Sequence, residues 1–254
     1  MTHRIRGFFY ILMFFLLVSG PKTICAEETS SEVQRITSII NKVIDAYGGK
    51  DIIEGIHSIH AKGKIEAFML HDRGTYEFYF KRGGKLRVET KYEHSSEVRV
   101  LSDERGYRST DTLPFEEVYG PRFLSMVYQY KHLNILHDLI TGAYRIRSVG
   151  RSRTSGDNIE VFRLNDKEGT VMDVSVDKQT FFIVKVAAYF SAENKQIDLS
   201  AEFSDFRKVG DAVFPFTITN YAGGLKIAQT VIEKYSLGPS MADSFFMPST
   251  IHSL

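Results

Sequence analysis

The sequence predicts an α+β fold built around one large antiparallel sheet that helices partly cover. Many short runs of alternating apolar and polar residues follow one another, and turn-forming Gly, Asp and Asn residues separate them. Two other segments, 36–47 and 123–140, repeat apolar residues at helical spacing. Short links between successive strands favour antiparallel neighbours, because parallel strands need long crossovers.

The start of the chain has the three-part layout of a secretory signal. Arg4 and Arg6 precede an apolar run from Phe8 to Val18, and Ser-Gly-Pro breaks this run before Ala26. The run is shorter than the roughly 20 apolar residues of a bilayer-spanning helix, so a retained anchor is the weaker interpretation. We expect residues 1–26 to be a cleaved signal peptide and the product to be exported.

Cys25 is the only cysteine of the chain. Cleavage after Ala26 removes it, and the mature chain then holds no disulfide, so its core alone must stabilise it. The alternative is a lipid-modified first residue at Cys25. Lys22, Thr23 and Ile24 fit poorly the small and leucine-like residues that precede such a cysteine, but this alternative stays open.

The charge balance excludes a polyanion binder. The chain has 32 basic and 31 acidic residues, and cleavage removes three basic residues and no acid, which leaves 29 and 31. No nucleic acid partner is expected. Residues 27–254 lack a linker rich in Pro, Ser or Gly and fit the size of one β-rich domain.

The mature chain is expected to open with a helix and to continue with strands. Thr29 to Glu32 forms a capping box, apolar residues follow at helical spacing, and Gly48-Gly49 ends the helix. Ile59, Ala61, Ile65 and Ala67 then alternate with polar residues. Further strand-like runs are RGTYEFYFKR, KLRVETKY, EVRVLS, YRIRSVG, NIEVFRL, VMDVSV, FFIVKVAAYF and LKIAQTVIEKY.

An antiparallel strand pair is clearest between Ile197 and Gly224. Ile197, Leu199, Ala201 and Phe203 fall on one strand face, and Phe214, Phe216 and Ile218 do the same after the KVGD turn. Each strand therefore has one apolar side.

The segment 121–140 interrupts the strands and predicts one or two amphipathic helices, with Pro121 in the first turn. A sheet of about ten strands with one apolar side needs more cover than two such helices supply. The surplus apolar surface is compatible with a packed core, a dimer interface or a ligand cavity.

Several stretches resemble the LolA-like family of exported bacterial lipoprotein-sorting proteins. They are AYGGKDIIEGIHSIHAKGKI, SDERGYRST, DFRKVGDAVFPFTI and the terminal SFFMP. The resemblance spans nearly the whole mature chain. It implies a strongly curved, incompletely closed antiparallel barrel with helices across its mouth, an apolar interior and a periplasmic location. It also implies a carrier without enzymatic activity, whose partners are a lipid or acylated lipoprotein and membrane-associated donor and acceptor proteins.

If the sheet curves around a cavity, apolar strand residues are expected to line it and helix residues to form the underside of a lid. The candidates for the lining are Ile65, Ala67, Tyr76, Phe78, Phe80, Val98, Val100, Phe162 and Phe203. The candidates for the lid are Phe123, Met126, Val127, Tyr130 and Leu133.

No pattern predicts catalysis, a metal or a cofactor. The histidine spacings do not fit a metal site, neither between His57 and His60 nor between His132 and His137. Ser240 lacks the second glycine of a nucleophile elbow. A hydrolase is therefore the weakest of three function classes.

The leading hypothesis is a periplasmic carrier or chaperone that shields an acyl chain or another lipid moiety on its way to the outer membrane. The second is an exported lipid-sensing or protein-interaction module of envelope regulation. Arg145, Arg147, Arg151 and Arg153 form a positive row, which is either solvated decoration or a docking patch for phosphate groups or an acidic partner.

Overall fold

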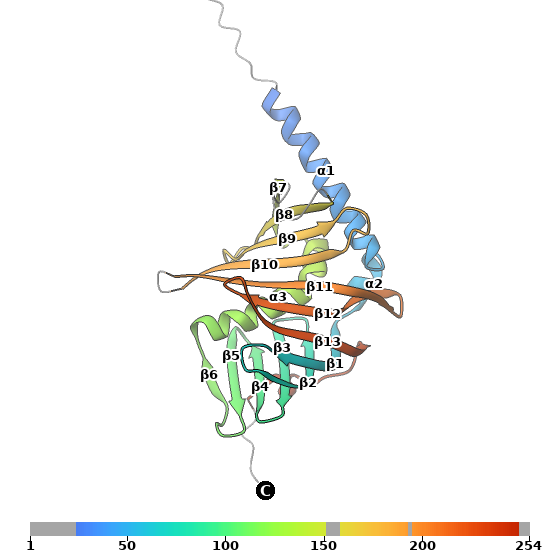
Figure 1. The fold of residues 1–254 in the computed structure, drawn as a ribbon. Helices are drawn as coiled ribbons and strands as arrows, with labels where there is room; N and C mark the ends of the chain where they lie inside the picture. Colours follow the sequence, from blue (N-terminus) through green and yellow to red (C-terminus); the bar gives the residue numbers. More distant parts are fainter. Residues whose placement is uncertain (1–23, 151–157, 193–194, 249–254) are drawn as a thin grey trace, which may run out of the picture. The chain divides into compact units, whose positions relative to one another are not determined.

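The computed structural model describes residues 24–150, 158–192 and 195–248 (Figure 1). Contacts divide the chain into two units, residues 1–35 and residues 36–254. Most of the predicted signal peptide, residues 1–23, lies outside the described residues, as do Arg151 and Arg153 of the positive row. Within the described ranges, no helix has both the length and the apolar content to cross a bilayer.

In the described part of the chain, three α-helices and one short 3-10 helix accompany the sheet. They are α1 (Ile24–Ala46), α2 (Lys50–Gly55), α3 (Gly120–Ile140) and η1 (Asp243–Phe246). Helix α1 ends as predicted, because Gly48 and Gly49 both adopt positive φ angles. The helix already runs from Ile24, the first described residue, so the predicted capping box at Thr29 to Glu32 does not mark its start. Helix α2 was not predicted.

The described residues form thirteen strands in one sheet, and every neighbouring pair is antiparallel. The first six are β1 (Ser58–Ala67), β2 (Asp72–Lys81), β3 (Lys85–Tyr92), β4 (Ser96–Ser102), β5 (Arg105–Thr110) and β6 (Glu116–Val118). The others are β7 (Arg145–Gly150), β8 (Ile159–Asn165), β9 (Val171–Asp177), β10 (Ile183–Ala192), β11 (Lys195–Val209), β12 (Ala212–Ala222) and β13 (Leu225–Leu237).

The strand order places the first and last strands side by side in the middle of the sheet. The order is β6-β5-β4-β3-β2-β1-β13-β12-β11-β10-β9-β8-β7, so the chain runs outward from β1 to one edge. Helix α3 then carries it to the other edge, and the remaining strands return to β13, which pairs with β1. The edges β6 and β7 do not pair with each other, which confirms the predicted α+β fold with an incompletely closed barrel.

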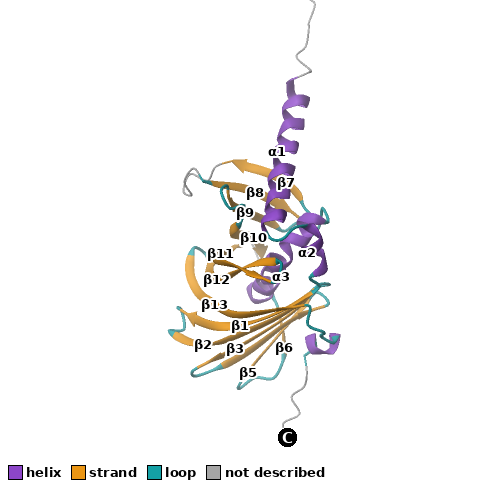
Figure 2. Cartoon of the chain, turned by 90° about the vertical axis from the view of Figure 1, so that its right-hand side faces the viewer, coloured by secondary structure: helices purple, strands orange, loops and turns teal. Residues whose placement is uncertain are grey.

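Helix α3 lies on the concave side of the curved sheet, between the strands of its two halves (Figures 1 and 2). It contacts β3, β4 and β5 on one side and β10 and β11 on the other. Every residue from Phe123 to Ile140 is buried or half-buried. The prediction of a helix with one apolar face was therefore wrong for this segment, because the sheet encloses α3 from more than one direction.

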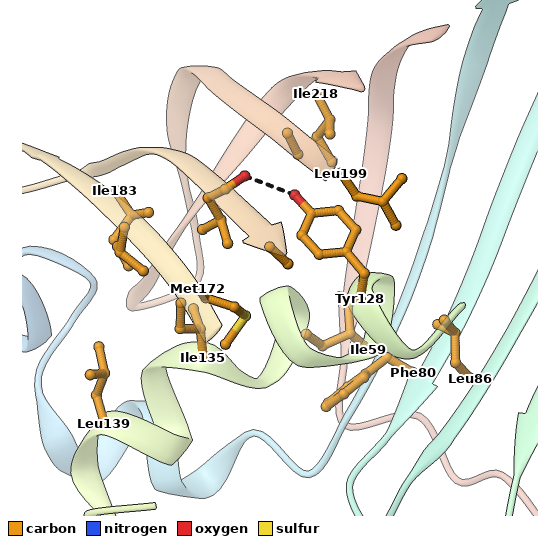
Figure 3. Packing of buried hydrophobic residues seen from close by; sticks show 14 of the residues in the cluster. Ile59, Phe80, Leu86, Tyr128, Ile135, Leu139, Met172, Ile183, Leu199 and Ile218 are labelled. Atoms are coloured by element: carbon orange, nitrogen blue, oxygen red, sulfur yellow. Dashed lines mark hydrogen bonds between the residues drawn. The ribbon is translucent and has the colours of Figure 1, made fainter. Parts of the chain in front are cut away.

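Hydrogen bonds hold α3 to both halves of the sheet. The Tyr128 hydroxyl donates to the carbonyl of Val186 in β10, at 2.9 Å (Figure 3). The Gln129 amide donates to the Tyr76 hydroxyl in β2, at 2.6 Å. The ammonium of Lys131 bonds to Asp166, beyond the end of β8. Helix α3 is thus anchored along its length.

The predicted strand faces agree with the burial of the side chains. Ile59, Ala61, Ile65 and Ala67 are all buried on the concave face of β1. Phe203 and Ile218 face each other across β11 and β12, as the register requires. Figure 3 shows side chains of the sheet, such as Met172 and Ile183, converging with Ile135 and Leu139 of α3. The core therefore lies between α3 and the concave face.

The pairing of β1 with β13 needs a glycine at position 63. The pairing register shifts between Lys62 and Gly63. A Cβ atom at Gly63 would lie 2.1 Å from the carbonyl oxygen of Val231 and 2.7 Å from the Cα atom of Ile232. Both are backbone atoms, so the two strands would have to separate.

We expect Gly63→Ala to lower the free energy of unfolding by about 2 kcal/mol, because the added methyl group overpacks the β1–β13 pair. Urea denaturation followed by circular dichroism measures the change. Gly55→Ala is the control, since no heavy atom lies within 4 Å of a Cβ atom at Gly55, the last residue of α2. It should raise stability by about 0.5 kcal/mol. Equal effects of the two changes would contradict this account of Gly63.

Candidate ligand-binding cavities

An apolar cavity of about 100 Å³ lies between α3 and the middle of the sheet. Leu133 and Leu136 of α3 line it on one side. Ile53 of α2 and Ile56, which follows α2, line another. The opposite wall consists of side chains of β1, β2, β10, β11, β12 and β13. This site is called the apolar cavity below.

His132 is a buried polar side chain in the wall of the apolar cavity. Its ring packs edge-on against the rings of Tyr128 and Phe203, with centroid distances of 5.1 and 5.6 Å. Among the residues that the structure describes, its Nδ1 atom has no hydrogen-bond partner. Burial lowers the pKa of His132 to about 4, so the imidazole is neutral at pH 7.

Arg82 closes the apolar cavity at the end of β2. Its guanidinium donates a hydrogen bond to the carbonyl of Glu54, at 2.8 Å, and another to the carbonyl of Ile53. These two carbonyls belong to α2, so Arg82 ties α2 to the end of β2. Partial burial lowers the pKa of the Arg82 guanidinium, which stays charged at neutral pH.

A second cavity, of about 300 Å³, opens towards the N-terminal half of α3. One wall is apolar and includes Ile65 and Ala67 of β1 and Ala228 of β13. The other wall is polar and includes Tyr76 of β2, Thr90 of β3, Glu97 and Arg99 of β4, and Ser125 and Gln129 of α3. This site is called the polar cavity below. Burial raises the pKa of Tyr76 to about 12, so its hydroxyl remains protonated.

The predicted lining residues divide between these sites. Phe78, Phe80 and Phe203 line the apolar cavity, whereas Ile65, Ala67 and Tyr76 line the polar cavity.

Three predicted lining residues line neither cavity. Phe162 is fully buried in the solid core, beside Val43 of α1 and Leu139 of α3. Val98 and Val100 alternate with Arg99 and therefore point to the convex face. There η1 contacts β3 and β4, and Val100 is completely buried. The inward assignment of these two valines was wrong, because the sheet has apolar cover on both faces at this point.

The predicted lid residues also lie in different places. Leu133 lines the apolar cavity, and Phe123 and Val127 line a wide depression next to β9 and β10. Met126 is buried in the solid core, with its sulfur close to Gly106 of β5. The Tyr130 hydroxyl accepts a hydrogen bond from the backbone N–H of Gly84, at 2.9 Å. The anchored helix is thus an internal support between the two halves of the sheet.

The sequence did not identify five of the residues that line the two cavities, which are Ile53, Ile56, Glu97, Arg99 and Gln129. The two isoleucines were missed because α2 has only six residues, too few for a helical period to stand out. In β4 the valines alternate with charged residues, and the usual rule of apolar residues inside selects the wrong face. No pattern in the sequence singles out Gln129 as a cavity residue.

One group of potential metal ligands exists among the described residues. Asp72, Glu93 and His94 place one ligand atom each within 4.8 Å of the others. The Asp72 carboxylate already accepts hydrogen bonds from the backbone N–H groups of Arg73 and Glu93, at 2.7 and 3.3 Å. These hydrogen bonds join the start of β2 to the turn between β3 and β4.

Comparisons with solved structures identify proteins of similar fold. A DUF1329 family protein from Desulfovibrio piger is 12% identical, with a TM-score of 0.51 over 83% of this chain and 96% of that chain. A putative outer membrane lipoprotein-sorting protein domain from Vibrio parahaemolyticus is 13% identical, with a TM-score of 0.50 over 76% of this chain and 90% of that chain. A LolA superfamily protein from Nitrosomonas europaea is 11% identical, with a TM-score of 0.49 over 83% of this chain and 96% of that chain.

At this identity the likeness concerns the fold, and at that level it confirms the resemblance to LolA-like proteins found in the sequence. The sequence matches no family model. It also matches no curated protein.

We expect His132 to make the protein sensitive to mild acid. Its folded-state pKa of about 4 lies below the unfolded value of 6.5, so the unfolded state binds more protons as the pH falls through this window. Wild-type stability should therefore fall by about 3 kcal/mol more than that of His132→Phe between pH 6.5 and 4.

Urea denaturation at a series of pH values measures this difference. His57→Gln, a change at an exposed histidine, is the control and should keep the wild-type dependence. Parallel curves for the wild type and His132→Phe would contradict the burial of a neutral imidazole.

Proposed function

We propose that the protein is an exported, non-catalytic carrier that holds an acyl chain or another lipid moiety on the concave side of its sheet. The apolar cavity between α3 and the sheet is the observation that carries this proposal. Most of its lining is apolar, and His132, Asn134 and His137 each add one buried polar atom without a hydrogen-bond partner among the described residues. An apolar ligand gains the contacts that the empty cavity lacks.

Two further observations support the same function. The fold is similar to that of a putative outer membrane lipoprotein-sorting protein domain. The signal-like first 26 residues support export, and with the fold they support a periplasmic location. Donor and acceptor proteins at the two membranes are the partners that such a carrier needs.

The size of the apolar cavity sets a condition on uptake. A cavity of 100 Å³ takes only a few carbon atoms, since one of about 150 Å³ holds a benzene molecule. A whole acyl chain therefore enters only if neighbouring elements move apart. Helix α2 is the element best suited to move, because it has only six residues, and its movement would break the two hydrogen bonds from Arg82. Each methylene group of the ligand that becomes buried contributes about 0.8 kcal/mol of binding free energy, which offsets the cost of this movement.

Leu133→Trp tests the proposal, because the larger side chain fills the apolar cavity from α3. We expect the purified variant to extract at least tenfold less palmitoyl lipid from phosphatidylethanolamine vesicles than the wild type. Native mass spectrometry of the recovered protein measures the bound lipid.

Leu124→Trp is the matched control. Leu124 is also half-buried on α3, but it lines the depression beside β9 and β10. It should keep wild-type extraction. A wild-type protein that extracts no lipid, or equal losses in two folded variants, would contradict the carrier proposal.

A further inference from the structure

The polar cavity has an unusual composition for the inside of a curved sheet. At this place the concave face changes from apolar to polar, with Tyr76 on β2, Thr90 on β3, Glu97 and Arg99 on β4, and Thr230 on β13. Thr90 and Thr230 are buried. Polar groups turned inward cost free energy unless they find partners, which for Tyr76 and Glu97 are Gln129 and Arg108. A cavity with this lining suits a polar occupant.

Three charged side chains next to this row leave an excess of positive charge. The Nε atom of Arg108 in β5 donates to one oxygen of Glu97, at 2.5 Å. The Nε atom of Arg99 lies 3.2 Å from the other oxygen. Two guanidinium groups thus share one carboxylate, and Glu97 and Arg99 both line the cavity. The net charge of the group is +1.

Arg99 has hydrogen-bonding capacity left over. Its Nε atom is shielded from solvent and, within the described part of the chain, makes no well-aligned hydrogen bond despite its closeness to Glu97. The Arg99 side chain as a whole is 26% exposed, so it is accessible from the cavity. A guanidinium presents its N–H groups in a planar fork that suits carboxylate and phosphate oxygens. The Arg99 guanidinium is therefore suited to an anion.

On β1 and β13 the lining of the same cavity is mostly apolar, and it reaches the rim. Ile65, Ala67 and Ala228 line its inner part. Met69 and Leu70 lie in the turn between β1 and β2, are 67% and 64% exposed, and also line the cavity. A molecule that fills this space meets charge on one side and hydrocarbon on the other.

We propose that the polar cavity binds the anionic head group of an amphiphile, with its phosphate or carboxylate at Arg99 and its apolar part along β1 and β13. The inference rests on the proposed lipid-binding function and names the class of ligand. An ordered water cluster is the competing occupant, and it would give the cavity no preference for an anion.

Two substitutions with opposite expected effects test the charge. Arg99→Gln removes the guanidinium that lines the cavity, and Glu97→Gln removes the carboxylate that partly neutralises it. Calorimetric titration with decyl phosphate at pH 8 and low salt should show at least tenfold weaker binding to Arg99→Gln. The same titration should show severalfold tighter binding to Glu97→Gln. Because Glu97→Gln keeps both arginines, it tests the proposal even if Arg99→Gln folds poorly.

Three controls separate the possible results. Both variants should bind 1-decanol, which has no charge, within twofold of the wild type. Arg105→Gln should leave the affinity for both ligands unchanged. Arg105 lies on the same strand as Arg108, but it pairs with Glu117 on the convex face. Inorganic phosphate alone should bind at least tenfold more weakly than decyl phosphate, since it lacks the apolar part.

Each contrary result has a distinct meaning. Binding of 1-decanol with no preference for decyl phosphate, or equal changes for both ligands, would overturn the head-group site and leave the carrier proposal intact. Equal affinity for inorganic and decyl phosphate would overturn the amphiphile in favour of a free anion. Failure of the wild type to bind either decyl ligand would overturn both proposals.

Discussion

The pairing of β1 with β13 is the contact on which the rest of the structure depends. It joins the first strand to the last and makes one continuous sheet out of two runs of strands. Without it, β1–β6 and β7–β13 would be separate sheets, each with an exposed edge and an apolar face. Gly63 permits the close backbone approach at the centre of this pair. The concave surface, and both cavities on it, exist because this pair holds.

Enclosure of α3 follows from that continuity. A helix against a flat sheet buries one face, but every residue of α3 from Phe123 onward is at least half-buried. Its polar side chains therefore need partners inside the protein, and Tyr128, Gln129 and Lys131 find them on opposite halves of the sheet. These bonds fix the helix, and the space along each half of it forms a separate cavity with its own chemistry.

The sequence predicts the strands and faces well where one side is apolar and the other polar. β1, β11 and β12 follow this rule because one side of each packs on the core. β4 does not follow it, since η1 covers its valines on the convex face while Glu97 and Arg99 turn inward. The local pattern contains no trace of η1, which arrives from the far end of the chain. The curvature of the sheet and the enclosure of α3 also depend on contacts between distant segments. The burial of α3 on several sides was therefore not predictable from its periodicity.

The different polarity of the two cavities has its physical origin in the strands rather than in α3. Both halves of the helix bring polar side chains to a cavity wall: Ser125 and Gln129 to the polar cavity, and His132, Asn134 and His137 to the apolar cavity. The strand residues at the apolar cavity are apolar or aromatic, such as Phe80 and Val186, whereas those at the polar cavity include Thr90, Glu97 and Arg99. An amphiphile has the same division between hydrocarbon and head group. One continuous sheet whose concave face changes in polarity, with α3 fixed against it, thus supplies surfaces suited to both parts of such a ligand.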